Sequence, residues 1–520
     1  MVTPVSFGKL DFKIVSSMEE EPQGVPEPET PFRIAIFGDF SGRASRGVFD
    51  PGSALIARRP VLVDRDNFDE VLAGMGVEIH VPVAGKDSPP VAIRFTELDD
   101  FHPDTIFERL EVFQALRDTR TKLDDPRTFA KAAEEVRSWA KNEIVPEPLE
   151  EDTARPSQTS EIPAGDIFDQ VLDKTEGSVR HAKPELDLSD LSGFLRKIVQ
   201  PYLVPKADPE QEELVAVVDK ATAELMSTIM HHPDFQAIES AWRGVHFLVS
   251  GLQTDAELKL YLVDISKDEL AVDLNATEDL RITSLYKVLL EKNSETAEKT
   301  PWAVVAGNYT FTRTREDAQF LGRMAKISSL ARAPFISAAH ATVLGCESFD
   351  TLPDPDDWKY VSDVEDGKAW EALRKLPESS YIGLALPRFL LRLPYGEETD
   401  PTEAFCFEEM PIQPEHESYL WGNPSFACVY LLGQAFSHYG WNLRPGAVLD
   451  INGLPLHVYK EQGESKTKPC AEMISTDRAV EIILDKGFMP FISFLNQDTI
   501  RLVRFQSIAD PATHLAGRWC

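Results

Sequence analysis

Two segments in the middle of the chain have the apolar spacing of amphipathic helices. In the first, Asp208 is a suitable N-cap, Pro209 suits the first helical position, and Gln211 stands where a capping box needs it. The apolar stripe that follows comprises Leu214, Val217, Ala221, Leu225 and Ile229. In the second, Asp234 is expected to cap a helix. Its stripe comprises Phe235, Ile238, Trp242, Val245, Val249 and Leu252. We expect the two helices to pack on a shared core.

Short apolar runs predict strands before these helices. Four runs are bounded by Gly, Asp or Pro, at residues 32–40, 59–63, 77–83 and 91–95. A helix is expected at 66–75, and another after Pro103. We expect these elements to form a compact α+β domain over residues 32–140.

Strands and helices alternate after the central helices. Strands are expected at 258–265, 302–311 and 335–339, and helices at 284–291 and 317–331. Alternation of this kind predicts an α/β core with a mixed sheet.

Composition suggests where the folded parts begin and end. Residues 1–31 contain a Pro- and Glu-rich stretch and are expected to be a disordered lead-in. Residues 141–185 carry more acidic than basic side chains and several prolines, which predicts an extended linker. A short helix at 167–172 could interrupt that linker. Residues 186–520 would then form the second folded part.

Charge narrows the classes of partner. The 520-residue chain has 53 Lys and Arg against 86 Asp and Glu, a formal net charge of −33. Such a chain repels phosphate backbones and anionic lipids, which disfavours nucleic acid and membrane surfaces as partners. A basic protein surface or a cation fits better, although general solubility explains the charge equally well.

The cysteines and the apolar runs bear on the compartment. The 5 cysteines lie far apart and include no CxxC pair, which favours a reducing environment. No run resembles a signal peptide or approaches the ~20 apolar residues of a membrane span. We therefore expect a cytoplasmic protein.

Three local patterns could suggest chemistry. The pair His231-His232 could bind a metal, but adjacent helical residues point about 100° apart, and helix-end capping is favoured. The loop at 38–42 lacks the Gly-Lys-Ser/Thr ending of a phosphate loop. An EF-hand starting at Asp354 fails because Trp358 and Lys359 occupy its fifth and sixth positions. These residues therefore favour a non-enzymatic interaction protein over an enzyme with an acidic pocket.

Ordered motifs nevertheless run through the chain. The segment MHHPDFQAIESAWRGVHFLV (230–249) contains Phe235, Gln236, Glu239, Trp242, Arg243 and Gly244. Later motifs are APFISAA (333–339), YIGLALPRFLLRLPYG (381–396), FCFEE (405–409), YLWGNPSFA (419–427, with Trp421), FSHYGW (436–441) and TDRAVEIILDKGFMPF (476–491). Together they resemble the large sheath subunit of type VI secretion systems (TssC/VipB/ImpC/EvpB).

The first part of the chain carries a second motif series. Its motifs are FGDFSGR (37–43), RPVLVDRDNFDEVLA (59–73) and LDDFHPDTIFERLEVFQALRDTRTKL (98–123). They resemble the small sheath subunit (TssB/VipA/ImpB). The chain therefore resembles a small subunit fused to a large one.

The resemblance implies a fold and a function. The fold would be tail-sheath-like, of mixed α+β and α/β class, with mixed sheets and packed helices. In the family, paired subunits stack into a contractile tube that expels an inner tube, and exchanged strands tie protomers together. Fusion would fix the subunit stoichiometry. Implied partners are self or other sheath subunits, the inner-tube protein, the baseplate and a Clp-type AAA+ unfoldase. No catalytic residue, cofactor or metal is implied.

Departures from the family leave an alternative open. Family members are normally separate chains, and Asn308 stands where the family usually has Asp. The large-subunit family also continues well past the strand corresponding to residues 500–505, into a tail that supplies interprotomer strands. The alternative is a non-polymerising fused sheath homologue that caps, nucleates or regulates sheath assembly.

Some motif residues invite specific roles. Arg243 could pair with a carboxylate in the core or lie at a subunit interface. Arg388 and Arg392 stand in an apolar run where charges need partners, and Glu408 and Glu409 are candidates.

A recognition helix for the unfoldase is also implied by the resemblance, near the start of the large-subunit part. Its apolar residues here would be Leu191, Phe194, Leu195 and Ile198. Packing of this helix on its own domain is the alternative.

Overall fold

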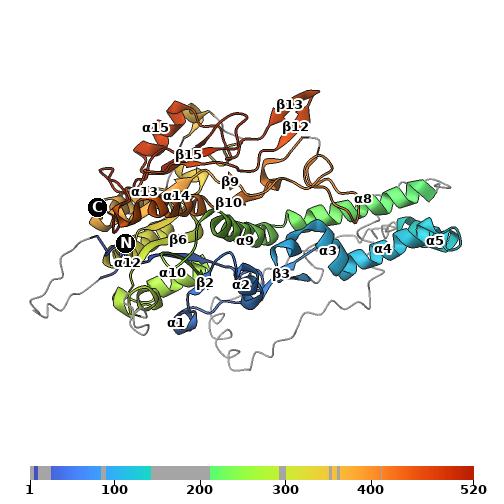
Figure 1. Cartoon of the computed structure of the whole chain (residues 1–520). Coiled ribbons are helices and arrows are strands. Elements are labelled where there is room, and N and C mark those ends of the chain that lie inside the picture. Colours follow the sequence, from blue (N-terminus) through green and yellow to red (C-terminus); the bar gives the residue numbers. More distant parts are fainter. Residues whose placement is uncertain are drawn as a thin grey trace, which may run out of the picture. The chain divides into compact units, whose positions relative to one another are not determined.

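The computed structural model describes residues 5–9, 25–83, 90–141, 211–291, 300–350, 354–359, 363–411 and 413–519 (Figure 1). The chain divides into two compact units. Unit 1 comprises Met1–Val81, Ala92–Leu110 and Ala223–Cys520, and unit 2 comprises Pro82–Val91 and Glu111–Thr222. The predicted linker at 141–185 lies almost wholly outside the described residues.

A nine-stranded mixed sheet forms the centre of unit 1, in the order β11-β15-β14-β8-β7-β6-β1-β5-β2. Its strands are β1 (Phe32–Gly38), β2 (Val61–Val63), β5 (Leu258–Asp264), β6 (Trp302–Phe311), β7 (Phe335–Ala339), β8 (Ile382–Leu386), β11 (Asp450–Ile451), β14 (Met489–Ser493) and β15 (Ile500–Leu502). Strands β5, β1, β6, β7, β8 and β14 run parallel, whereas β2, β15 and β11 pair antiparallel. This confirms the α/β mixed class.

The position of β1 corrects the prediction that residues 32–140 form a domain of their own. Strand β1 lies between β5 and β6, which come from the second part of the chain. Every residue of β1 is buried. A strand without polar alternation must be covered on both faces, as the centre of a parallel sheet is. Residues from both motif series therefore share one sheet (Figure 1).

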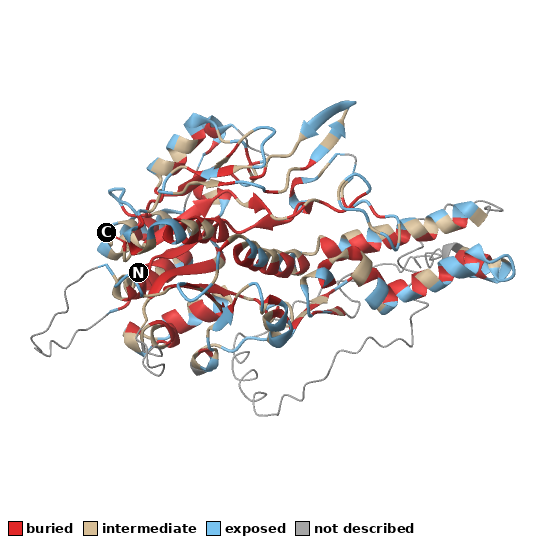
Figure 2. Cartoon of the chain, viewed as in Figure 1, coloured by how far each residue is buried: buried red, intermediate tan, exposed pale blue. Residues whose placement is uncertain are grey.

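Helices cover the sheet on both faces. Ala35 and Phe37 of β1 belong to a core cluster with residues of α10 (Lys267–Asn275) and α12 (Arg315–Ala331). Helix α14 (Pro424–Tyr439) packs on β1 and on β5 to β8, and α9 (Pro233–Gly251) packs on α14. Figure 2 shows the central strands as buried over most of their length.

The remaining elements of unit 1 are short. Its other helices are α1 (Ser53–Ala57), α2 (Phe68–Met75), α3 (Pro103–Arg109), α11 (Ser284–Tyr286), a π turn (Lys287–Glu291), α13 (Val364–Arg374) and α15 (Asp477–Asp485). The 3₁₀ turns are η1 (Leu98–Phe101), η4 (Leu280–Ile282), η7 (Ala341–Leu344), η8 (Pro355–Asp357), η9 (Pro377–Tyr381), η10 (His416–Ser418) and η11 (Gly440–Asn442). Two-stranded sheets pair β3 (Val77–Val81) with β4 (Val91–Phe95), β9 (Phe389–Leu390) with β10 (Trp421–Gly422), and β12 (Val458–Glu461) with β13 (Glu464–Thr467).

Unit 2 is helical in its described part. It contains α4 (Glu111–Asp124), α5 (Phe129–Lys141) and the first half of α8 (Gln211–Met230). The side-chain amide of Gln211 donates to the carbonyl oxygens of Leu123 and Asp124 at 2.7 and 3.0 Å. Arg120 Nε lies 2.6 Å from Asp219 Oδ1. Polar contacts therefore tie α8 to α4 within this unit.

Residues 5–9 correct the prediction of a wholly disordered lead-in. The ring of Phe7 packs on Gly322, where a Cβ would lie only 2.1 Å from it. The backbone of Lys9 exchanges hydrogen bonds with Glu278 and Leu280 at 2.6 and 3.1 Å. Packing of Phe7 and the backbone hydrogen bonds of Lys9 hold this short segment in place within unit 1. The Pro- and Glu-rich residues that follow it in the sequence gave no indication of this order.

Candidate functional site: helix α9 and its buried ion pairs

Helix α9, which carries the clearest motif, begins with a histidine cap. His232 Nδ1 accepts a hydrogen bond from the backbone N of Asp234 at 3.3 Å, and Pro233 occupies the first turn. The prediction that Asp234 is the cap was therefore wrong by two residues. The neighbouring His231 has its Nδ1 3.2 Å from Ser227 Oγ and its Nε2 3.6 Å from Glu409 Oε1. Within the described ranges, no group of three His, Cys, Asp or Glu side chains could hold a metal ion.

The apolar stripe of α9 joins the two motif series. Trp242 is fully buried, and its Nε1 donates to the carbonyl oxygen of Phe40 at 2.9 Å. Its ring packs edge-on against Phe40 and Phe68, with centroids 5.9 and 5.7 Å apart. Phe235 packs likewise against Phe95 and Phe101, at 5.8 and 6.0 Å. The small-subunit-like part thus supplies the aromatic partners of the large-subunit-like helix.

Other motif residues contact segments far along the chain. Gln236 Nε2 donates to the carbonyl oxygen of Glu417 at 2.9 Å. Trp421 Nε1 donates to the carbonyl oxygen of His416 at 2.8 Å, and the Trp421 carbonyl accepts from Ser240 Oγ at 2.8 Å. These motif residues have clear structural contacts inside unit 1.

Gly244 allows α9 to approach α14 closely. A Cβ at this position would lie 2.6 Å from the ring of Phe426, which is fully buried and has little room to move. We expect Gly244→Ala to destabilise the protein by ~1–3 kcal/mol, despite the better helix propensity of alanine. Urea unfolding measures the change. The matched control is Gly74→Ala in α2, where a Cβ meets nothing within 4 Å; an equal loss there would contradict the steric argument.

A buried ion cluster links α9 to the segment after β9. Arg392 lies between two carboxylates: its Nε is 2.7 Å from Glu239 Oε1 and its Nη1 is 2.6 Å from Glu409 Oε2. Glu239 also receives Arg243 Nε at 2.7 Å, and Arg243 Nη2 donates to Tyr395 Oη at 2.9 Å. The backbone N of Tyr395 donates to Glu409 at 2.8 Å. Each buried charge therefore has several partners, as burial requires.

The prediction that Arg388 pairs with Glu408 or Glu409 was wrong. Arg388 Nη2 lies 2.6 Å from Glu472 and 3.2 Å from Glu417, rather than beside Glu408 or Glu409. The reason is a β-bridge that pairs Phe389 with Ala471 and brings the neighbouring Glu472 opposite Arg388. The predicted partner Glu408 instead accepts a hydrogen bond from the backbone N of Glu397 at 2.9 Å.

The ion pairs set the protonation of their carboxylates. Burial alone would raise the pKa of Glu409, but the charge of Arg392 outweighs it and lowers the pKa to about 2. Burial would also raise the pKa of Glu472. Its contacts with His416 and Arg388 outweigh burial and lower that pKa to about 2. Burial would lower the pKa of Arg392, but the charges of Glu239 and Glu409 outweigh it and raise that pKa. All three groups are charged at neutral pH.

These pKa values predict a loss of stability in acid. Glu409 binds a proton near 4.5 when unfolded but only near 2 when folded, so the unfolded state gains protons first as the pH falls. The stabilisation is complete above about 4.5 and lost toward about 2. Denaturant unfolding across this range should show a steeper pH dependence in the parent than in Glu409→Gln. The control Glu408→Gln should keep the parent slope, and identical slopes in parent and Glu409→Gln would contradict the assignment.

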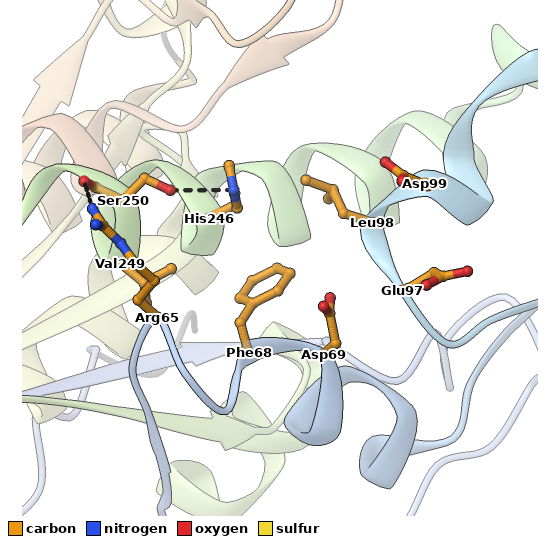
Figure 3. A pocket seen from close by; sticks show the side chains of 9 residues that line it. All are labelled: Arg65, Phe68, Asp69, Glu97, Leu98, Asp99, His246, Val249 and Ser250. Carbon is orange, nitrogen blue, oxygen red and sulfur yellow. Dashed lines mark hydrogen bonds between the residues drawn. The ribbon is translucent and has the colours of Figure 1, made fainter.

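A cleft of about 230 Å³ opens beside α9 (Figure 3). Phe68 and Asp69 point from α2 toward α9, while Glu97 and Asp99 lie on the η1 side. Arg65 Nη2 donates to the carbonyl oxygen of Ser250 at 2.5 Å, and Ser250 Oγ lies 3.1 Å from His246 Nε2. The side chains that line the cleft include Arg65, Phe68, Asp69, Glu97, Asp99 and His246.

Comparison with known proteins assigns the family. The family model described as EvpB/VC_A0108, tail sheath N-terminal domain, matches residues 212–509, more than half of the chain. The chain belongs to this tail sheath family. A second family model, described as Type VI secretion system, VipA, VC_A0107 or Hcp2, matches residues 18–151. The tail sheath chain therefore carries both sheath subunit families, in the order that its motifs indicate.

Two relatives of the tail sheath chain come from Pseudomonas aeruginosa. The type VI secretion system sheath protein TssC1 is 36% identical over 309 residues, which are 58% of this chain and 62% of the relative. The type VI secretion system sheath protein TssB1 is 28% identical over 105 residues, which are 19% of this chain and 59% of the relative. The chain thus spans about three fifths of the length of each relative that it matches.

One site prediction falls outside the described part of the tail sheath chain, and two contact partners were not predicted. The suspected unfoldase-recognition helix (Leu191, Phe194, Leu195 and Ile198) lies outside the described residues and stays a prediction. Glu472 and Tyr395 are partners that the sequence reasoning missed. Glu472 is 84 residues from Arg388, so no local spacing could have indicated it. Tyr395 lies three residues after Arg392 in the same motif. Its position near an arginine in an apolar run could have indicated that its hydroxyl group is a hydrogen-bond partner for a buried charge.

Proposed function

We propose that this chain is a structural subunit of the contractile sheath of a type VI secretion system. In this proposal, copies of the chain polymerise into a tube around an inner tube and expel it on contraction. One polypeptide supplies what two sheath subunits supply in the relatives, named as sheath proteins TssC1 and TssB1.

The insertion of β1 supports this proposal most directly. Strand β1 lies in the VipA-matched range and pairs on both sides with strands of the VipB-matched range. Its register with β5 runs from Phe32 opposite Leu258 to Gly38 opposite Asp264. A small-subunit part that completes the large-subunit sheet makes the fused chain one self-contained building block.

Further partners and the location follow from the proposed role. The partners would be other sheath copies, the inner-tube protein, the baseplate and a Clp-type AAA+ unfoldase, with the tube assembled in the cytoplasm. A structural role without catalysis accords with the family assignment. No helix among the described residues has the length and apolar character needed to cross a membrane.

Electron microscopy tests the proposal. The full chain, expressed without other sheath proteins and examined by negative stain at physiological salt, should form hollow, helically ridged tubes. Expression alone in a host without a secretion system ensures that the tubes contain this chain only. Monodisperse particles under conditions where a purified two-chain sheath forms tubes would contradict the proposal.

The inserted strand also predicts that the join between the two parts is dispensable for the fold. A protease site placed between residues 142 and 210 can be cut after purification. The two fragments should stay together on size exclusion, because separating them would remove β1 from between β5 and β6. An Ile36→Asp variant should weaken that association, since Ile36 is fully buried in the strand. Separation of the parent fragments in native buffer would contradict this prediction.

A further inference from the structure

The cleft beside α9 has walls fixed by packing. The ring of Phe68 stands edge-on to Trp242 and to His246, at centroid distances of 5.7 and 5.5 Å. Phe68 and Val249 are buried, whereas Asp69, Glu97 and Asp99 are exposed at the rim. The cleft therefore has a mainly polar lining, with carboxylates at its opening and a small apolar surface from Phe68 and Val249 (Figure 3).

The charges around the cleft leave its rim negative. Arg65 donates to the carbonyl oxygen of Ser250 and keeps its positive charge, and Glu97 lies 3.7 Å from Arg109, so the excess negative charge of the rim comes from Asp69 and Asp99. Among the described residues, neither Asp69 nor Asp99 makes an ion pair. Desolvation and the nearby charge of Arg243 lower the pKa of His246, so its ring is uncharged at neutral pH and does not repel a cation.

A lysine or arginine side chain matches this lining. Its cationic head suits the carboxylates of Asp69 and Asp99, and its narrow stem needs only the small apolar surface that Phe68 and Val249 provide. The volume of about 230 Å³ is below the ~300–1,000 Å³ usual for drug-sized ligands and is suited to a single side chain.

We propose that this cleft binds a lysine or arginine side chain of a second copy of this chain. The proposal rests on the proposed sheath function, which brings copies side by side. Copies that each carry a net charge of −33 repel one another, so a contact between them needs local pairs of opposite charge. A cation seated in the cleft would supply such a pair and would orient the neighbouring copy.

Assembly of charge-neutralised variants is the first test. The double variant Asp69→Asn/Asp99→Asn should raise the concentration needed for tube formation about tenfold, as measured by sedimentation of tubes at physiological salt. The matched control Asp66→Asn/Glu70→Gln removes two charges from the same region outside the cleft lining and should assemble at least as well as the parent. Equal behaviour of the two double variants would overturn the proposal.

Binding of a small cation is the second test, and it does not depend on tubes. At a concentration of the full chain below that at which tubes form, N-acetyl-arginine amide should shift the NMR signals of the His246 ring, saturably, and not in Asp69→Asn/Asp99→Asn. The uncharged N-acetyl-citrulline amide should give no shift. A missing shift, or an equal one with citrulline, would overturn the cleft as a cation site. If the unsubstituted chain forms no tubes, that result counts against the sheath function and not against the cleft. The binding of N-acetyl-arginine amide still decides whether the cleft binds cations.

Discussion

Trp242→Ala is expected to lower the free energy of unfolding of unit 1 by ~3–5 kcal/mol. The Trp242 side chain is fully buried between Phe40 and Phe68, so its removal leaves a large cavity at the contact between the two motif series. The substitution also leaves the carbonyl oxygen of Phe40 without its donor. Denaturant unfolding followed by circular dichroism should show an earlier transition.

Two controls separate the causes of this loss. Trp242→Phe keeps most of the ring but removes the Nε1 donor, and it should cost less than alanine. Tyr439→Ala removes an aromatic ring that is 53% exposed, and it should change the stability little. A small effect of Trp242→Ala, similar to that of Tyr439→Ala, would show that Trp242 does not hold the two parts together.

Arg392→Met is expected to cost ~3–5 kcal/mol, for an electrostatic reason. Methionine keeps much of the side-chain volume but removes the arginine charge from Glu409, while Glu239 retains Arg243. Glu409 then keeps only the backbone N of Tyr395 and the ring of His231 near its carboxylate, so burial should raise its pKa. The deficit of the variant should therefore shrink as the pH falls, which pairwise unfolding measurements at several pH values can check.

An exposed ion pair provides the comparison. Arg501 pairs with Asp450 at the surface, with side chains 49% and 40% exposed, and Arg501→Met should cost far less stability than Arg392→Met. A double-mutant cycle of Arg392→Met with Glu409→Gln should also show strong coupling. Equal costs of the two arginine substitutions, or additivity in the cycle, would contradict the buried-pair argument.

Both predictions concern the same region, where α9 meets distant segments. Trp242 on one side of α9 contacts the small-subunit-like part, and Glu239 on the same helix contacts Arg392. The helix is therefore the element through which the two motif series and the segment after β9 share one core. Two residues of its motif, Glu239 and Trp242, make these contacts.

Local elements of this chain followed from its sequence. The strand patterns at 32–40, 258–265, 302–311 and 335–339 correspond to β1, β5, β6 and β7, and the apolar stripe of α9 is buried as its spacing indicates. Periodicity is a property of neighbouring residues, so it can be read along the chain. The ordered motifs also indicated the family.

The tertiary structure alone decided how distant segments combine. The apolar run of β1 indicated a buried strand, but not that its neighbours would be β5 and β6, more than two hundred residues away. The apolar run around Arg388 indicated the need for a counter-ion, but only the bridge at Phe389 and Ala471 selected Glu472. A buried strand edge needs a hydrogen-bonding partner, and a buried charge needs a counter-ion, so the sequence can indicate that a partner exists. Which distant residue becomes the partner depends on tertiary packing, and local sequence patterns do not contain that information.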